Sequence, residues 1–346
     1  MLVQGITVVT RPTRMQSLLQ RWSTRGQAQF LFKRNRVVEF AKKNQAAQAA
    51  DQRAAKAAID EVENDAMEDF AELESEDSNY QRVIETLRRE LDFGVPIQFI
   101  DRNYLPTYNF DNSFLVVVVG QDGLVANAAK YVGNLPIVAV NPDPARIDGV
   151  LLPFHVKDAR TAVQRVIDGN AKMRSVTLAK ASLHDGQKLL AFNDLFIGAR
   201  SHVSARYQLT VGRSAEQQSS SGILISTGAG STGWLSSIVN MANGLGAFLD
   251  PKLQPHWRMP LRWEDRQLIW IVREPFISKS SQAQLVAGKL QPGHELIIES
   301  QMAEGGVIFS DGVEQDFLSF TSGSIATITI SEQSAKLVVK TATPHH

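Results

Sequence analysis

The sequence predicts a doubly wound α/β domain followed by a β-rich domain. Two continuous apolar segments, 114–119 and 135–140, have the composition of strands that are buried on both faces of a parallel sheet. The segment between them, 124–132, predicts a helix and completes a strand–helix–strand unit with a right-handed crossover. After residue 155, many short β-rich runs separated by turn residues are typical of a β-sandwich or a compact β domain.

The remaining elements follow from the same patterns, and they divide the chain into a domain over 1–155 and a domain over 156–346. In the first domain we expect strands at 5–10 and 96–100, helices at 14–47 and 80–91, and a helical, acidic insertion at about 45–80 that forms a solvated helix or a flexible arm. In the second domain we expect a helix at 158–172 and strands at 188–192, 195–197, 205–211, 222–226, 268–272, 295–300, 307–309 and 325–330.

Composition restricts the classes of function. Positive and negative residues balance at 36 each, which favours a small-molecule partner over nucleic acid. The absence of cysteine excludes disulfides, cysteine metal sites and cysteine nucleophiles. The seven histidines lack metal-ligand spacing, and His345 and His346 are interpreted as tag remnants. With no apolar run of membrane-spanning length and no signal-peptide pattern, we expect a cytoplasmic protein without a membrane partner.

The first candidate site is the tetrapeptide Gly120-Gln121-Asp122-Gly123, which follows a buried strand and precedes a helix. Ligands of open α/β sheets bind at this edge, and a helix N-terminus there offers free N–H groups to a phosphate. An aspartate at this place can hold Mg²⁺ or accept a proton from an attacking hydroxyl. The alternative is a plain turn, for which Asp-Gly is a favoured pair.

Three further segments carry polar residues in apolar surroundings. The loop 225–234 combines three glycines with four hydroxyl residues that could surround a polar ligand, and its Trp234 could cover a base; the alternative is a flexible serine-rich turn. Asn193-Asp194 interrupts an apolar run and could bind paired ribose hydroxyls, or it could form a bulge or hairpin turn. Asp311-Gly312 is by itself most typical of a hairpin turn.

Taken in order, Gly120–Leu124, Asn193-Asp194, Thr227–Thr232 and Asp311-Gly312 resemble the NAD kinase family. The family pattern is a Gly-Gly-Asp-Gly-Thr loop, an Asn-Glu pair, a Thr-Pro-Thr-Gly-Ser-Thr loop and a late Asp-Gly. Some segments are more similar to the mitochondrial-type branch, namely Val8–Arg14, Val140–Pro144, Ser220–Gly222, the proline-free Thr227–Ser231 with Trp234, and Arg273–Pro275.

The resemblance implies a Rossmann-like N-terminal domain, a β-sandwich-like C-terminal domain and an active site between them. It implies transfer of the γ-phosphoryl group of ATP, with Mg²⁺, to the adenosine ribose 2′-hydroxyl of NAD, which gives NADP. Asp122 would be the catalytic carboxylate, and the protein would be a homodimer through its β domain. The ligand-binding residues that it implies are Gly120, Gly123, Asn193, Asp194, Thr227, Ser231, Thr232, Gly233, Trp234, Ser237 and Asp311.

Three residues depart from the family pattern. Gln121 replaces a glycine, Leu124 replaces a threonine, and Asp194 replaces a glutamate. Because a glycine often permits close backbone approach or a positive φ, the first two changes leave open a second hypothesis. The chain would then be a weak or inactive relative that binds NAD or NADP as a sensor or scaffold. A kinase for another hydroxyl substrate is a third hypothesis, since lipid kinases have a similar loop; the 193–194 pair and the 226–234 loop speak against it.

Overall fold

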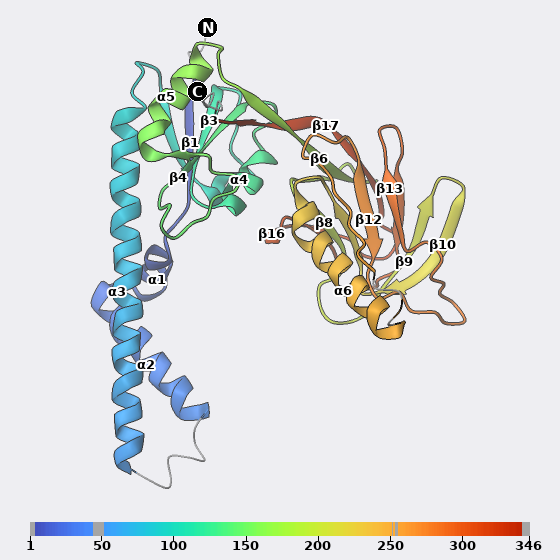
Figure 1. Cartoon of the computed structure of the whole chain (residues 1–346), viewed down its shortest axis with the longest axis horizontal. Coiled ribbons are helices and arrows are strands. Elements are labelled where there is room, and N and C mark those ends of the chain that lie inside the picture. Colours follow the sequence, from blue (N-terminus) through green and yellow to red (C-terminus); the bar gives the residue numbers. More distant parts are fainter. Residues whose placement is uncertain (1–3, 44–51, 251, 253–254, 341–346) are drawn as a thin grey trace.

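The computed structural model describes residues 4–43, 52–250, 252 and 255–340. The predictions made for 44–51 and for the two terminal histidines lie outside this range. Figure 1 shows the arrangement of the elements. Those of the first half are β1 (Gly5–Thr10), α1 (Arg14–Trp22), α2 (Arg25–Lys43), α3 (Gln52–Glu90), β2 (Ile97–Asp101), β3 (Ser113–Val119), α4 (Asp122–Ala129), β4 (Pro136–Asn141), β5 (Phe154–His155) and α5 (Ala159–Ile167).

The predicted α/β domain is confirmed. β1, β2, β3 and β4 are parallel and lie in the order β4-β3-β1-β2, so β3 is flanked on both sides. Residues 115–119 of β3 are fully buried, as a continuous apolar strand inside a covered sheet requires. Side chains of α4 pack on one face of this sheet, and side chains of α3 and α5 pack on the other. The carboxyl ends of β1, β3 and β4 therefore meet at one edge.

The second half is the β-rich domain that the sequence predicts. Its strands form the six-stranded sheet β13-β12-β11-β8-β15-β16 and part of a larger sheet, and one apolar cluster fills the space between them. Helix α6 was not predicted. The elements are β6 (Met173–Leu183), β7 (Lys188–Ala191), β8 (Asp194–Ala199), β9 (Ala205–Val211), β10 (Ser214–Ser220), β11 (Ile223–Ser226), α6 (Trp234–Leu249), β12 (Leu268–Val272), β13 (Ala287–Leu290), β14 (Leu296–Ser300), β15 (Gly306–Ser310), β16 (Val313–Ser319) and β17 (Ile325–Val338).

Two long strands, β6 and β17, connect the halves of the molecule (Figure 1). They are antiparallel to each other, and the end of β17 pairs in parallel with the start of β4 through Lys336 and Leu337. The larger sheet is therefore continuous from the first half into the second. The proposed domain boundary near residue 155 stays a prediction. α5 follows this boundary in the sequence, yet its side chains pack on the N-terminal sheet.

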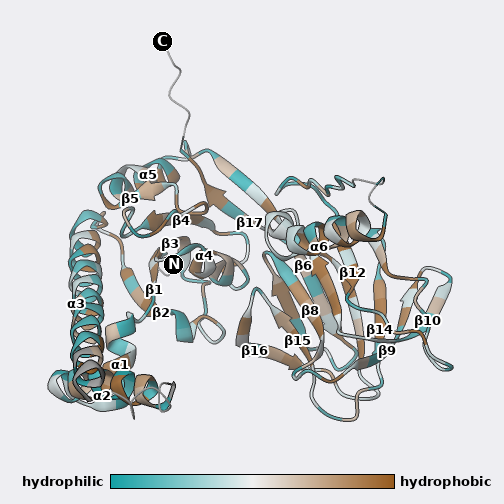
Figure 2. Ribbon diagram, turned by 60° about the horizontal axis from the view of Figure 1, so that its bottom comes forward, coloured by the Kyte–Doolittle hydropathy of each residue, from teal (hydrophilic) through white to brown (hydrophobic). Residues whose placement is uncertain are grey.

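The acidic segment forms most of α3, a helix of 39 residues that extends beyond the N-terminal sheet with α1 and α2 beside it (Figure 1). Figure 2 shows that α3 is largely hydrophilic, whereas the strands of both sheets carry much of the hydrophobic colour. Acidic residues of α3 form ion pairs with basic residues of α2, among them Lys33–Glu63 and Arg36–Asp69. None of the helices that the structure describes has both the length and the apolar character needed to cross a membrane.

Candidate active site

Asp122 is the first residue of α4, at the carboxyl edge of the N-terminal sheet. One oxygen of its carboxylate accepts a hydrogen bond from the Leu151 backbone N–H at 2.7 Å, and the other accepts from Val150 at 3.2 Å. These bonds hold the side chain in a defined position. A carboxylate has about four lone-pair sites, so both oxygens retain capacity for a further partner.

The two altered residues of this loop fit the chain without strain. Gln121 has φ −114° and ψ 166°, an ordinary extended conformation, so the fold does not require a glycine there. Leu124 is buried against the core, and a Cβ at Gly120 would lie 2.8 Å from its Cδ2. At Gly123, by contrast, a Cβ would meet no atom within 4 Å. Packing therefore explains Gly120, whereas the space at Gly123 is open to a ligand.

Asn193 and Asp194 lie at the bend between β7 and β8, and Asp311 fixes this bend. The Asp311 carboxylate accepts hydrogen bonds from the backbone N–H groups of Phe192 at 3.0 Å, Asn193 at 2.6 Å and Asp194 at 3.2 Å. Its own N–H donates to the Asp194 carbonyl at 3.0 Å. Asp311 also has a positive φ of 55°, a conformation that aspartate tolerates better than most residues. The late Asp-Gly turn is thus part of the Asn193-Asp194 structure.

The Asp194 carboxyl group is enclosed, and its Oδ1 is buried without a hydrogen-bond partner among the described residues. Burial raises the pKa of this carboxyl to about 7; the Asp311 carboxylate acts in the same direction and the Ser226 hydroxyl acts against it. A buried acceptor without a partner is costly, so this oxygen is suited to receive a ligand hydroxyl.

The raised pKa of Asp194 predicts a pH dependence of stability. In the unfolded chain an aspartate has a pKa of about 3.9, so the folded state favours the protonated form. This contribution is complete below about pH 4 and is lost as the pH rises through about 7. We expect Asp194→Asn to remove that loss and to be about 4 kcal/mol more stable than the wild type at pH 8. Urea unfolding at pH 5 and pH 8 measures this; parallel pH profiles for the two proteins would contradict it.

The loop after β11 contacts the Asn193-Asp194 bend directly. The Thr227 hydroxyl donates to the Phe192 carbonyl at 2.5 Å, and the Thr227 N–H donates to the Asn193 carbonyl at 2.9 Å. A Cβ at Gly230 would lie 2.3 Å from the Asn193 carbonyl oxygen and 2.6 Å from Asp194 Oδ1. The two predicted motifs therefore form one structure, and a glycine is needed where they touch.

The remaining predicted residues of this loop lie farther along it, toward α6. Ser231 is occupied internally, because its hydroxyl donates to the Gly228 carbonyl at 2.7 Å. Thr232, Gly233 and Ser237 are exposed to solvent. Trp234 is 39% exposed and stacks on Phe196 with ring centroids 5.7 Å apart. The Arg273 guanidinium also lies over the Trp234 ring, 5.2 Å from its centroid. The structure thus leaves Thr232, Gly233 and Ser237 accessible and Trp234 partly exposed, and their contact with a ligand stays a prediction.

The residues that join α4 to the β domain are not among those that the sequence predicts for the site. Lys130, whose side chain is almost fully buried, donates to the Ser310 hydroxyl at 2.7 Å and pairs with Asp316 at 3.2 Å. Tyr131 also donates to Asp316. Asp122 is the first residue of α4, and Lys130 is its C-cap residue. Because Lys130 bonds Ser310, the last residue of β15, the helix connects Asp122 to the strand that precedes Asp311. No sequence pattern marks Lys130, because its partners lie 180 and 186 residues away.

The parts of the site thus lie on facing segments. Leu124 of α4, Phe192 of the bend and Ala229 of the loop share one apolar cluster, which places Asp122 and Asp194 on elements that pack together. The site therefore defines a class of two-domain protein, in which an α/β domain and a β domain present polar groups suited to a phosphate-bearing ligand. These groups are the start of α4 and the buried Asp194 Oδ1, which has no hydrogen-bond partner among the described residues.

Comparisons with known proteins agree with this class. No protein-family model matches the chain. The NAD kinase of Bordetella avium (strain 197N) is 29% identical over 143 residues, which are 39% of this chain and 45% of that protein. The chain therefore spans less than half the length of this curated relative.

Solved structures share the fold over more of the chain. Yeast NADH kinase complexed with NADH has a TM-score of 0.54 at 15% identity and covers 98% of this chain and 84% of its own. An NAD kinase from Archaeoglobus fulgidus in complex with ATP has a TM-score of 0.50 at 17% identity. The match covers 75% of this chain and 88% of that protein. The fold is that of the NAD kinases, and the resemblance to the NAD kinase family is confirmed. The mitochondrial-type likeness stays a prediction.

Proposed function

We propose that the protein is an NAD kinase that transfers the γ-phosphoryl group of ATP to the adenosine ribose 2′-hydroxyl of NAD. The observation that carries the proposal is the buried Asp194 Oδ1, for which the described part of the chain offers no hydrogen-bond partner. It lies in a bend that Asp311 and Thr227 hold in place. A pair of ribose hydroxyls is the kind of donor that would satisfy this group. The relative and the structural neighbours, which are an NADH kinase and NAD kinases, support the same proposal.

In this proposal Asp122 accepts the proton of the attacking hydroxyl or binds the Mg²⁺ that accompanies ATP. The described residues contain no group of three or more His, Asp or Glu side chains arranged to hold a metal ion. A single carboxylate nevertheless fits Mg²⁺, which is commonly bound by one or two carboxylates together with the phosphates of the substrate. The chain itself would position the two substrates and supply the carboxylate, as phosphoryl transfer requires.

The test is an assay of the purified protein with ATP, Mg²⁺ and NAD. We expect NADP to accumulate, with turnover in the range of about 1–100 s⁻¹ that is usual for kinases. NADH and polyphosphate, supplied in place of NAD and ATP, determine the acceptor and the donor. A folded protein that makes no NADP with any of these pairs would refute the proposal.

The second candidate, a dinucleotide-binding relative with little turnover, is favoured by one observation. Gln121 places a long side chain beside the helix start where the donor phosphates are expected. This candidate predicts tight binding of NAD or NADP in calorimetry, together with an absence of labelled phosphate transfer. Phosphate transfer to NAD at a kinase-like rate would exclude it.

We also propose that the protein is a cytoplasmic homodimer that associates through its β domain. Four large apolar side chains of α6 are at least half exposed, namely Met241, Leu245, Phe248 and Leu249. Contiguous exposed apolar residues of this kind are typical of protein interfaces. Light scattering on the purified protein tests the oligomeric state, and a monomer at micromolar concentration would count against it.

A further inference from the structure

A pocket bordered by three arginines lies beside Gln121. It has about 270 Å³ of open volume and is formed where β1, β3 and β4 end. Arg11 and Arg14 follow β1, and Arg146 lies in the loop after β4. A water molecule occupies about 30 Å³ in the liquid, so the pocket has room for a chain of phosphate groups. Guanidinium groups are the side chains best suited to bind phosphate oxygens.

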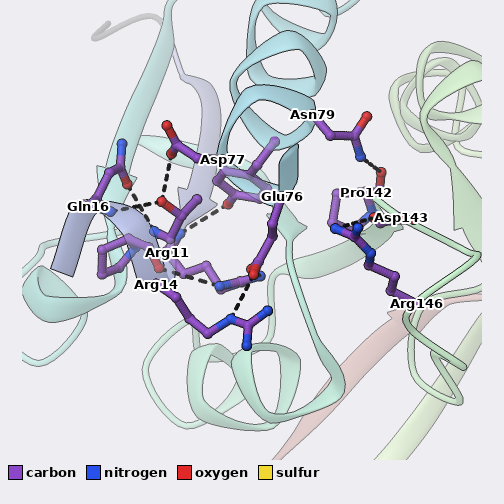
Figure 3. Close-up of polar contacts among 12 residues, drawn as sticks. Arg11, Arg14, Gln16, Glu76, Asp77, Asn79, Pro142, Asp143 and Arg146 are labelled. Carbon is purple, nitrogen blue, oxygen red and sulfur yellow. Dashed lines mark hydrogen bonds and ion pairs between the residues drawn. The ribbon is translucent and has the colours of Figure 1, made fainter. Parts of the chain in front are cut away.

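The helix α3 closes this pocket with a carboxylate. Figure 3 shows that Glu76 points at both Arg11 and Arg14. Glu76 accepts from Arg11 Nη2 at 2.9 Å and from Arg14 Nε at 2.8 Å. Burial acts to raise the pKa of Glu76, but the hydrogen bonds from the two arginines outweigh it and hold that pKa below its usual value. Glu76 is therefore an anion at neutral pH.

Arg11 lines this pocket and is largely buried. Its side chain is only 12% exposed, its guanidinium lies over the Tyr80 ring at 5.4 Å, and its Nε is buried with no hydrogen-bond partner among the described residues. Glu76 thus satisfies only part of the hydrogen-bonding capacity of Arg11.

Two neighbours of Glu76 in α3, Asp77 and Tyr80, form hydrogen bonds that fix the position of Glu76. The Tyr80 hydroxyl donates to the Val119 carbonyl at the end of β3 at 2.8 Å and accepts from the Arg11 N–H. Thr13, the N-cap residue of α1, donates to Asp77 at 2.6 Å. α3 is therefore anchored at the edge of the sheet where the phosphoryl donor is expected, and Glu76 remains beside Arg11 and Arg14.

We propose that this pocket binds the phosphate chain of the phosphoryl donor and that Glu76 is a built-in anion that competes with it for Arg11 and Arg14. This inference rests on the proposed function and adds a regulatory role for Glu76 of α3. Three arginines and two carboxylates, Glu76 and Asp143, line the pocket. Neutralising Glu76 makes the net charge of this lining more positive by one unit, which strengthens its attraction for a polyphosphate.

Calorimetry with inorganic tripolyphosphate on the full chain tests the inference. We expect Glu76→Gln to bind tripolyphosphate roughly tenfold more tightly than the wild type, since one repulsive charge at close range is removed. Arg146→Met should bind several-fold more weakly. Glu74→Gln is the matched control, because Glu74 is an acidic residue two positions away that pairs with Arg25 outside the pocket; its affinity should equal that of the wild type.

The outcomes separate this inference from the kinase proposal. Unchanged or weaker tripolyphosphate binding by folded Glu76→Gln would overturn the competing role of Glu76. A tenfold gain that Glu74→Gln reproduces would also overturn it, because the effect would then reflect the overall charge of α3. A gain specific to Glu76→Gln supports the inference even if no NADP is formed, in which case only the kinase proposal fails.

Discussion

Replacing Asp122 with asparagine is expected to reduce the rate of NADP formation by about 10³-fold, the usual effect of removing a group that transfers a proton or holds the reacting phosphate. Asparagine has nearly the same shape but lacks the charge. Its oxygen can still accept from the Leu151 N–H, while its NH₂ group faces the Val150 N–H and loses that bond. We therefore also expect a loss of about 1–2 kcal/mol in the free energy of unfolding.

The measurement is kcat for NADP formation by wild type and Asp122→Asn, with NAD affinity determined separately by calorimetry. Asp148→Asn is the matched control, since Asp148 is an exposed acid in the loop that Asp122 contacts. NAD affinity should stay within a factor of about three in both variants, because the Asn193-Asp194 bend is intact. A kcat above one tenth of the wild-type value in Asp122→Asn would show that the carboxylate is not part of the chemistry.

The sequence predicts the α/β half well because local patterns determine it. A continuous apolar strand such as 114–119 is typical of a covered parallel sheet, and Asp-Gly before an apolar helix predicts a site at the strand end. The order of the four motifs then indicates the family. The contacts between them, such as Thr227 with the Asn193-Asp194 bend, are consistent with a shared site but could not be derived from spacing alone.

Several elements of the β half could not be predicted, and tertiary contacts explain why. β10 has the sequence SAEQQSS, whose residues favour helix or loop. It is a strand because it pairs with β9, and its buried Glu216 accepts from the backbone N–H groups of Gln284 and Leu285. In α6, glycines at 244 and 246 disfavour helix, yet Leu235 and Val239 pack one turn apart against the sheet. The local sequence shows neither the strand that pairs with β10 nor the sheet that supports α6.

The pocket lined by Arg11, Arg14 and Arg146 could not be predicted from the local sequence either. Arg11, Arg14 and Pro142 belong to segments whose likeness to a family branch is visible in the sequence, but their convergence is not. It depends on α3, which returns from a long excursion to place Glu76, Asn79 and Tyr80 across three strand ends. The acidic segment, which composition predicts to be a solvated helix or a flexible arm, thus contributes one wall of the pocket.

Replacing Gly230 with alanine is expected to have the largest effect on the dinucleotide side. The new methyl group would lie 2.3 Å from the Asn193 carbonyl oxygen, far inside van der Waals contact. The bend cannot retreat easily, because five hydrogen bonds hold it. Asp311 accepts from three of its backbone N–H groups, and Thr227 donates to the Phe192 and Asn193 carbonyls. We expect a loss of about 3 kcal/mol in unfolding free energy and at least a tenfold loss of NAD affinity.

Gly244→Ala is the matched control for Gly230→Ala, since a Cβ at Gly244 in the exposed part of α6 would meet no atom within 4 Å. It should leave NAD affinity unchanged and stabilise the fold by up to about 1 kcal/mol through helix propensity. Urea unfolding and calorimetric titration of NAD on both variants give the two quantities. If Gly230→Ala matched Gly244→Ala in both, the contact between the 226–234 loop and the Asn193-Asp194 bend would not determine the binding site. If stability fell while NAD affinity held, that contact would support the fold alone, and the ribose would be bound elsewhere than at Asp194.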